Sequence, residues 1–117
     1  MLPGDFERIR AQGSPVSDVV WQWLEFFYRF HRTLGYEGAP MHDPCAVMAL
    51  IHPELFTMKD YYVRIETEGD YCKGATVADW NGLEGHAPNA ACILDVDRAA
   101  FADALVALIG RYGEVGA

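Results

Sequence analysis

The sequence has few basic residues and no long hydrophobic run. Only nine of its 117 residues are Lys or Arg, against 17 Asp or Glu, so the net charge is −8. A surface that binds nucleic acid or an anionic membrane needs clustered Lys and Arg, whereas these basic residues are scattered. No apolar stretch reaches the ~20 residues that span a bilayer. The composition argues against nucleic-acid and membrane partners.

Cysteine is scarce and shows no pairing pattern. Cys45, Cys72 and Cys92 are odd in number and have none of the close spacings typical of metal knuckles. Each stands among apolar neighbours, so we expect buried free thiols in a reducing compartment. Residues 1–5 contain no basic segment leading into an apolar run, as a signal peptide would. We therefore expect a cytoplasmic protein.

Hydrophobic residues make up 51% of the chain and aromatics 13%, which predicts one domain, residues 1–117, with a rich core. Ser14 and Pro15 open the longest predicted helix, which runs to about Leu34. Its apolar residues form two adjacent files: Val16, Val20, Trp23, Phe27, Phe30 and Leu34, and then Trp21, Leu24 and Tyr28. Either this helix is central in the domain, or part of its apolar surface belongs to an interface.

The remaining pattern predicts an α+β fold, in which helices precede a small sheet and a C-terminal helix. A short helix is expected over Pro3–Gln12, and an apolar, buried helix after Pro44. Asp97 should cap the last helix, which we expect to end before Gly110. Alternating hydrophobicity predicts three strands of one small sheet, at residues 61–67, 75–80 and 90–96.

The only adjacent His-Asp pair, His42–Asp43, precedes Pro44 at the start of the apolar helix. Asp43 could simply cap this helix, because its carboxylate can accept from free backbone N–H groups and proline needs no donor there. His42 would then be an ordinary loop histidine. Alternatively, Asp43 offers a carboxylate to a metal and His42 a proton near neutral pH. The local sequence leaves both interpretations open.

The other candidate residues have simpler structural explanations. Asp95 and Asp97 could flank one oxygen-binding site, but they suit a strand end and a helix cap better. His31 stands beside an aromatic cluster, and His52 and His86 have no evident partner in the sequence. No serine-histidine-acid order or phosphate-binding glycine loop is present.

The surroundings of the His-Asp pair resemble a known family. Residues 38–47, Gly-Ala-Pro-Met-His-Asp-Pro-Cys-Ala-Val, resemble the C-terminal His-Asp-Pro motif of the inosine-uridine-preferring nucleoside hydrolases. Four further blocks are similar to that family in the same order: 53–57, 63–67, 74–80, and Asn89 with 94–97. The resemblance therefore covers nearly the whole chain.

This resemblance implies hydrolysis of the N-glycosidic bond of purine or pyrimidine ribonucleosides. A Ca²⁺ ion in the family binds the ribose hydroxyls and the attacking water. By resemblance, Asp43 is the C-terminal metal ligand and His42 is the catalytic residue that assists departure of the base. Tyr28, Phe30 and His31 are the candidates for the base pocket.

The chain also departs from the family, because the N-terminal Asp-x-Asp-x-x-x-Asp-Asp motif is absent. Asp95-x-Asp97 begins similarly, but Phe101 and Ala102 stand where the last two aspartates belong. Ca²⁺ takes about six to eight oxygen ligands, so Asp43 alone cannot hold it. We therefore expect the C-terminal part of a nucleoside hydrolase, a fragment of its α/β fold, without activity or tight Ca²⁺ binding by itself.

Two alternatives remain on the sequence alone. One is a non-catalytic interaction module that self-associates through the long helix, and a homo-oligomer is expected under this and the first hypothesis. The other is a different hydrolase that uses His42 and Asp43 unaided. A ribonucleoside would be the partner if an N-terminal part completes the site.

Overall fold

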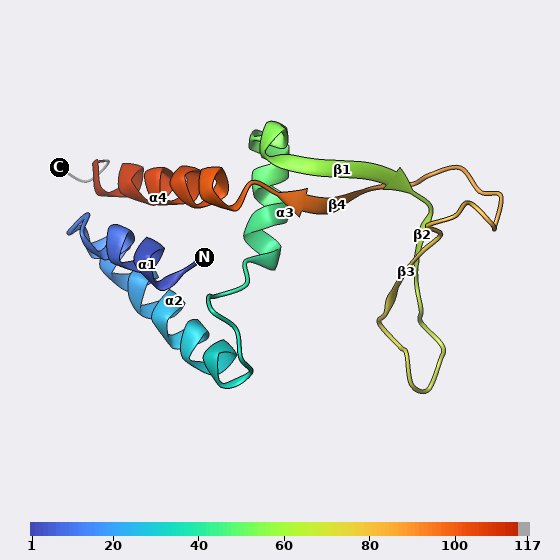
Figure 1. Cartoon of the computed structure of the whole chain (residues 1–117), viewed down its shortest axis with the longest axis horizontal. Helices are drawn as coiled ribbons and strands as arrows, with labels where there is room; N and C mark the ends of the chain where they lie inside the picture. Colours follow the sequence, from blue (N-terminus) through green and yellow to red (C-terminus); the bar gives the residue numbers. More distant parts are fainter. Residues whose placement is uncertain (115–117) are drawn as a thin grey trace. The chain divides into compact units, whose positions relative to one another are not determined.

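The computed structural model describes residues 1–114, over which the chain forms four α-helices, one 3₁₀ turn and four short strands (Figure 1). The elements are α1 (Pro3–Arg10), α2 (Pro15–Thr33), α3 (His42–Ile51), η1 (Pro53–Leu55), β1 (Phe56–Tyr61), β2 (Val63–Ile65), β3 (Thr76–Ala78), β4 (Ala90–Val96) and α4 (Arg98–Glu114). The predicted α+β class is confirmed. Within the described residues, no helix is both long and apolar enough to cross a membrane.

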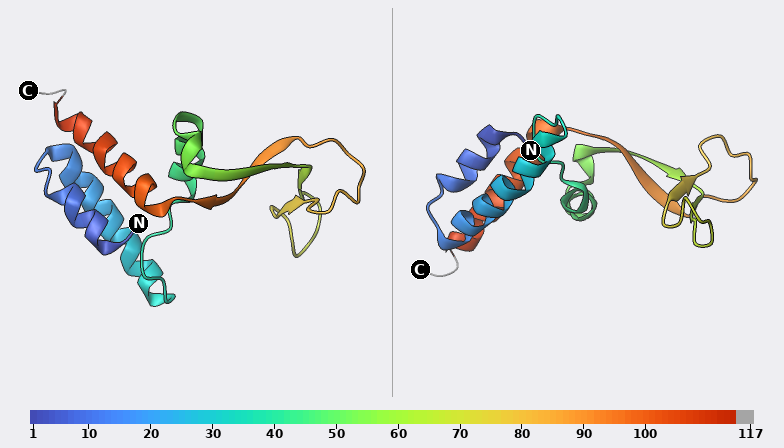
Figure 2. Two further views of the ribbon diagram at one scale, coloured as in Figure 1. Left: turned by 45° about the horizontal axis from the view of Figure 1, so that its top comes forward. Right: turned by 90° about the horizontal axis from the view of Figure 1, so that it is seen from below.

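Contacts divide the chain into two compact units. Of the described residues, 1–55 and 97–114 form the helical unit, and 56–96 form the strand unit. In the helical unit, α1, α2 and α4 lie side by side (Figure 2). Phe6 and Ile9 of α1 are 1% and 0% exposed, and they share the core with four buried residues of α4: Phe101, Ala102, Val106 and Ile109.

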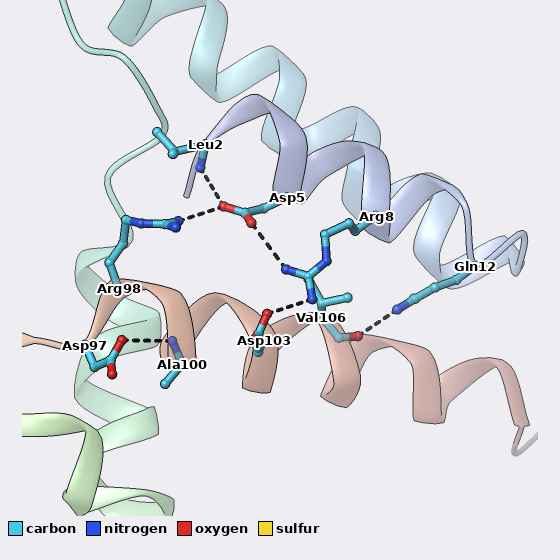
Figure 3. A network of polar contacts seen from close by, with 9 residues as sticks. All are labelled: Leu2, Asp5, Arg8, Gln12, Asp97, Arg98, Ala100, Asp103 and Val106. Atoms are coloured by element: carbon cyan, nitrogen blue, oxygen red, sulfur yellow. Dashed lines mark hydrogen bonds and ion pairs between the residues drawn. The ribbon is translucent and has the colours of Figure 1, made fainter.

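A polar network joins α1 to α4 within the helical unit (Figure 3). The buried carboxylate of Asp5 accepts from the Leu2 amide at 2.8 Å and from the Arg98 guanidinium at 3.1 Å. Arg8 lies between Asp5 and Asp103, and its Nη2 is 2.7 Å from the Asp103 carboxylate. A buried charge must be paired and hydrogen-bonded to be tolerated, and here both conditions are met.

The capping predictions for α2 and α4 are confirmed, but the predicted end of α4 is wrong. Ser14 accepts from the Ser17 amide at 3.0 Å at the start of α2. However, α4 continues through Gly110 to Glu114. A Cβ at Gly110 would lie 3.2 Å from Nε2 of Gln12. The glycine therefore permits a close approach within the helical unit and does not end the helix.

The predictions for α3 are wrong in two respects. The helix begins at His42 after Met41, so Asp43 lies in its first turn and is not its cap. The helix was expected to be buried because it is apolar on every side, yet Met48 is its only buried residue. Val47 and Leu50 are 62% and 84% exposed, so the apolar composition of α3 does not bury it among the described residues.

The strand unit contains two separate two-stranded sheets, so the predicted single three-stranded sheet is wrong. β1 pairs antiparallel with β4, and β2 pairs antiparallel with β3. The predicted strand over 61–67 is divided at Tyr62, because the chain before it pairs with β4 and the chain after it pairs with β3.

The expected burial of the thiols is also wrong, since Cys72 is exposed and Cys45 and Cys92 are half-buried.

Candidate functional site

The loop that leads into the His-Asp pair is fixed by the start of the chain. The amine of Met1 donates to the Ala39 carbonyl at 2.7 Å, and the Ala39 amide donates to the Met1 carbonyl at 2.8 Å. Gly38 is required beside this pairing, because a Cβ there would collide with the Met1 carbonyl oxygen. Burial lowers the pKa of the Met1 amine. These hydrogen bonds between Met1 and Ala39 fix the position of the backbone three residues before His42.

His42 and Asp43 form part of the wall of a pocket in the helical unit. The pocket has a volume of about 410 Å³ and lies between α2 and the segment that begins α3. Its lining consists of Trp23, Leu24, Phe26 and Phe27 from α2, together with Pro40, Met41, His42, Asp43 and Pro44. His42 and Asp43 contribute the only ionisable side chains of this lining. The pocket therefore combines an aromatic surface with one imidazole and one carboxylate.

Both ionisable groups are available for a ligand or a partner. His42 and Asp43 are exposed, and within residues 1–114 neither side chain has a hydrogen-bond or ion-pair partner. Asp43 lies in the first turn of α3, where free N–H groups and the helix dipole favour a negative charge. Asp5, by contrast, is buried and fully engaged with its neighbours.

The base-pocket candidates Tyr28, Phe30 and His31 do not line this pocket. Tyr28 packs instead on Phe6, with ring centroids 5.7 Å apart. The His31 Nδ1–H donates to the Phe27 carbonyl at 3.0 Å, so its imidazole is engaged within α2. The rings in the pocket belong to Trp23, Phe26 and Phe27, of which Trp23 and Phe27 were already on the predicted apolar face.

The remaining candidates have structural roles. Asp97 caps α4, as predicted, and its carboxylate accepts an amide of the first turn at 3.0 Å. His52 and His86 have partners that were not evident in the sequence. Nδ1 of His52 lies 2.9 Å from the Glu54 carboxylate, and the His86 ring lies 4.5 Å from the Tyr62 ring between centroids.

The residues of this chain do not by themselves fit the calcium site that the resemblance implies. Across residues 1–114, no group of three or more His, Cys, Asp and Glu side chains could hold a metal ion. Asp43 has no second carboxylate beside it in the pocket lining. The carboxylate of Asp95 accepts from the adjacent Val96 amide, and that of Asp97 caps α4.

The family model for "inosine-uridine preferring nucleoside hydrolase" matches residues 1–103. The chain belongs to this family. It is 46% identical over 114 residues to the pyrimidine-specific ribonucleoside hydrolase RihA of Klebsiella pneumoniae subsp. pneumoniae, covering 96% of this chain and 37% of the relative. Against RihA of Shigella flexneri it is 48% identical over 110 residues, covering 92% and 35%.

Solved nucleoside hydrolases have the same fold over this length. A purine-preferring ribonucleoside hydrolase from Gardnerella vaginalis matches 99% of this chain with a TM-score of 0.80 and 19% identity. The plant nucleoside hydrolase PpNRh1 matches 94% with a TM-score of 0.76 and 23% identity. In each case the chain spans 37% of the solved structure. The chain is therefore a part of the nucleoside hydrolase fold, consistent with the predicted C-terminal part.

Proposed function

We propose that this chain provides the His42 and Asp43 side of a nucleoside hydrolase active site. The reaction is hydrolysis of the N-glycosidic bond of ribonucleosides, and the chain alone is inactive. The observation that carries this proposal is the pocket of about 410 Å³ in which an unpaired imidazole and an unpaired carboxylate meet aromatic rings. The alternative of a self-associating module without a catalytic role is not favoured by the family match.

His42 is the group that we propose assists the departing base. Cleavage of the N-glycosidic bond leaves negative charge on the base, and a proton or hydrogen bond from an imidazole stabilises that charge. A ring N–H of the imidazole can donate to a leaving group that lies within hydrogen-bond distance. A positioned general acid of this kind contributes about 10²–10⁴ to the rate.

The aromatic wall of the pocket suits a planar base. Trp23, Phe26 and Phe27 offer aromatic rings to a bound base. Aromatic pairs prefer an offset-stacked or an edge-to-face arrangement. Because the similar RihA proteins are named pyrimidine-specific, we propose pyrimidine ribonucleosides as the first substrates to test. Purine ribonucleosides are the second class.

Asp43 is the residue that we propose as a calcium ligand in a completed site. A carboxylate oxygen is the donor that Ca²⁺ prefers, but the ion needs several more. Since the described residues supply no such set, the other ligands must come from another polypeptide segment. Tight Ca²⁺ binding by this chain alone is not expected. The cytoplasmic location and the homo-oligomer stay predictions.

The test compares the chain alone with the chain mixed with a completing polypeptide. The completing polypeptide is Klebsiella RihA without the segment that this chain matches. Release of base from uridine, cytidine and inosine is measured by chromatography in the presence of Ca²⁺. We expect no turnover by either piece alone and turnover by the mixture.

The His42→Ala variant separates catalysis from assembly. In the mixture it should lower kcat by about 10²–10⁴, with little change in the binding of the two pieces. Substantial turnover by the chain alone would contradict the proposal and favour a hydrolase that needs no partner. An inactive mixture in which the two pieces are shown to associate would also overturn it.

A further inference from the structure

The strand unit contains a hollow that the proposed function does not use. It has a volume of about 280 Å³ and lies where β1 ends, with walls formed by residues 59–62 and 79–82, His86 and Pro88. It shares no residue with the pocket that contains His42 and Asp43. Pockets for drug-sized ligands measure about 300–1,000 Å³, so this hollow suits a smaller ligand.

Hydrogen bonds fix the backbone around this hollow. The Tyr61 carbonyl accepts from the Asn89 amide at 3.1 Å. The Tyr62 carbonyl accepts from the Asp79 amide at 2.9 Å. The side chain of Asn89 also bonds to both polar backbone groups of Val63, at 2.8 and 2.9 Å. The walls are therefore in place before a ligand arrives, which lowers the entropy cost of binding.

Two pairs of aromatic rings line the hollow. The Tyr61 and Trp80 rings are in edge-to-face contact, with centroids 4.6 Å apart. The His86 ring lies 4.5 Å from the Tyr62 ring between centroids, at an interplanar angle of 38°. Trp80 is nevertheless 57% exposed, so part of its ring stays open to a ligand. These rings supply the apolar surface that is typical of small-molecule pockets.

Polar side chains of both charges complete the lining. Four of them have no hydrogen-bond or ion-pair partner within residues 1–114: Lys59, Asp60, Asn81 and His86. The ammonium group of Lys59 lies over the Tyr61 ring, 5.0 Å from its centroid. Asp79 stays ionised at neutral pH, because the backbone amides from which its carboxylate accepts lower its pKa. The lining thus combines an ammonium that only donates, carboxylates that only accept and an amide that does both.

This mixture of charges argues against a ligand of one sign. An anion would meet the carboxylates of Asp60 and Asp79, and a cation would meet the ammonium of Lys59. Within residues 1–114, no group of three or more His, Cys, Asp and Glu side chains could hold a metal ion. A hydroxyl group donates one hydrogen bond and accepts two, so a neutral ring that carries several hydroxyls can use donors and acceptors of the lining together.

We propose that this hollow binds a monosaccharide, whose hydroxyls bond to Lys59 and Asp60 while one C–H face of the sugar lies on the Trp80 ring. This site is separate from the proposed function and does not rest on it. A site that hydrogen-bonds the hydroxyls of its ligand rejects an analogue that lacks them, because the polar groups of the site then lose their partners. A ring without hydroxyls therefore distinguishes a sugar site from a merely apolar hollow.

Titration of the whole chain with D-glucose and with D-galactose, followed by NMR of the indole N–H groups, tests the proposal. The chain has three tryptophans, and we expect a saturable shift of Trp80 with at least one of the two sugars. For so small a ligand we expect a Kd on the order of millimolar. Tetrahydropyran, a ring without hydroxyls, and the charged probes tetramethylammonium and acetate should give no saturable shift.

Variants then connect the binding to the lining. Calorimetry should show an affinity for the sugar that is lower by about tenfold or more in Trp80→Ala. Asp60→Ala should give a loss of similar size, and it removes a side chain without partners, so the fold is kept. Tyr71→Ala is the matched control, because Tyr71 is an aromatic residue of the same unit that is 99% exposed and lies outside the hollow. It should leave the affinity unchanged.

The outcomes decide between a sugar site and an ordinary surface. No saturable shift with either sugar would overturn the proposal, and so would saturable binding of tetrahydropyran or of a charged probe at Trp80. A shift of Trp23 without one of Trp80 would place the sugar beside His42 and would also overturn it. Circular dichroism checks the fold of Trp80→Ala, and equal affinities of Asp60→Ala and Tyr71→Ala would contradict the assignment even if Trp80→Ala unfolds.

Discussion

Different interactions stabilise the helical unit and the strand unit, each within itself. Among residues 1–114, every buried hydrophobic side chain except that of Phe56 belongs to the helical unit. The strand unit depends instead on two short ladders and on turns held by side-chain acceptors such as Glu66 and Asp79. The comparison shows that the unit bearing the candidate site is organised by its own core, whereas the other unit is held by backbone ladders and by side-chain acceptors in its turns.

Replacing one isoleucine by alanine in each unit should give the largest difference in the free energy of unfolding. Ile9 is 0% exposed and Ile65 is 54% exposed. Ile9→Ala leaves a cavity in the core and should lower the free energy of unfolding by about 2–5 kcal/mol. Ile65→Ala should cost less than about 1 kcal/mol. Urea denaturation followed by circular dichroism and Trp fluorescence measures both, and equal losses would contradict the comparison.

Removing one carboxylate from each unit should give the next largest difference. Asp5→Ala removes the acceptor for the Leu2 amide and for Arg98, and should cost about 1.5–3 kcal/mol. Glu84→Ala breaks the Arg64–Glu84 ion pair, which is exposed to solvent and screened. We expect no resolvable change in the denaturation midpoint for Glu84→Ala. A loss as large as that of Asp5→Ala would show that the strand unit depends on this ion pair.

The parts of the fold that were predicted correctly are those encoded by neighbouring residues. Ser14 and Asp97 cap α2 and α4 because their side chains accept amides within three residues, a pattern visible in the sequence. Strand pairing joins residues far apart, and the division at Tyr62 depends on which partner each half finds. The burial expected for α3 failed because apolar composition does not tell whether the covering surface belongs to the same chain.

The candidate site was predictable in its chemistry but not in its surroundings. His42 and Asp43 stand in a recognisable motif, and the family that it indicated is confirmed. Their assignment as catalytic residue and metal ligand stays a proposal. The aromatic lining depends on which side of α2 faces the His42 loop, a matter of tertiary packing. Trp23 and Phe27 therefore line the pocket, while Tyr28 packs on α1.

A smaller effect on stability is expected when the side-chain amide of Asn89 is removed from the strand unit. Oδ1 of Asn89 accepts from the Val63 amide at 2.8 Å, and its Nδ2 donates to the Val63 carbonyl at 2.9 Å. Asn89→Ala should cost about 1 kcal/mol or less and speed hydrogen exchange in β2 and β3. Asn81→Ala, in an exposed turn, is the control. Unchanged exchange in the Asn89 variant would show that the ladders hold without this bridge.

The smallest expected effect is local and depends on pH. The Asp79 carboxylate accepts from the Glu84 amide at 2.8 Å and the Leu83 amide at 2.9 Å, and these bonds hold its pKa below the ordinary 3.8. Because the folded state lowers this pKa, the stabilisation is present above about pH 4 and is lost as the pH falls through the folded value. Amide chemical shifts followed by NMR from pH 7 to low pH measure this.

Asp79→Asn distinguishes this titration from general acid unfolding. The amide side chain does not titrate and can accept at only one of its two ends, so the pH-dependent shifts at Leu83 and Glu84 should disappear. The Glu66 carboxylate, whose pKa is lowered by the amides of Glu68 and Gly69, should still titrate in the same variant. If both turns lost their pH response together, the strand unit would be one cooperative body and not a set of local hydrogen-bonded turns.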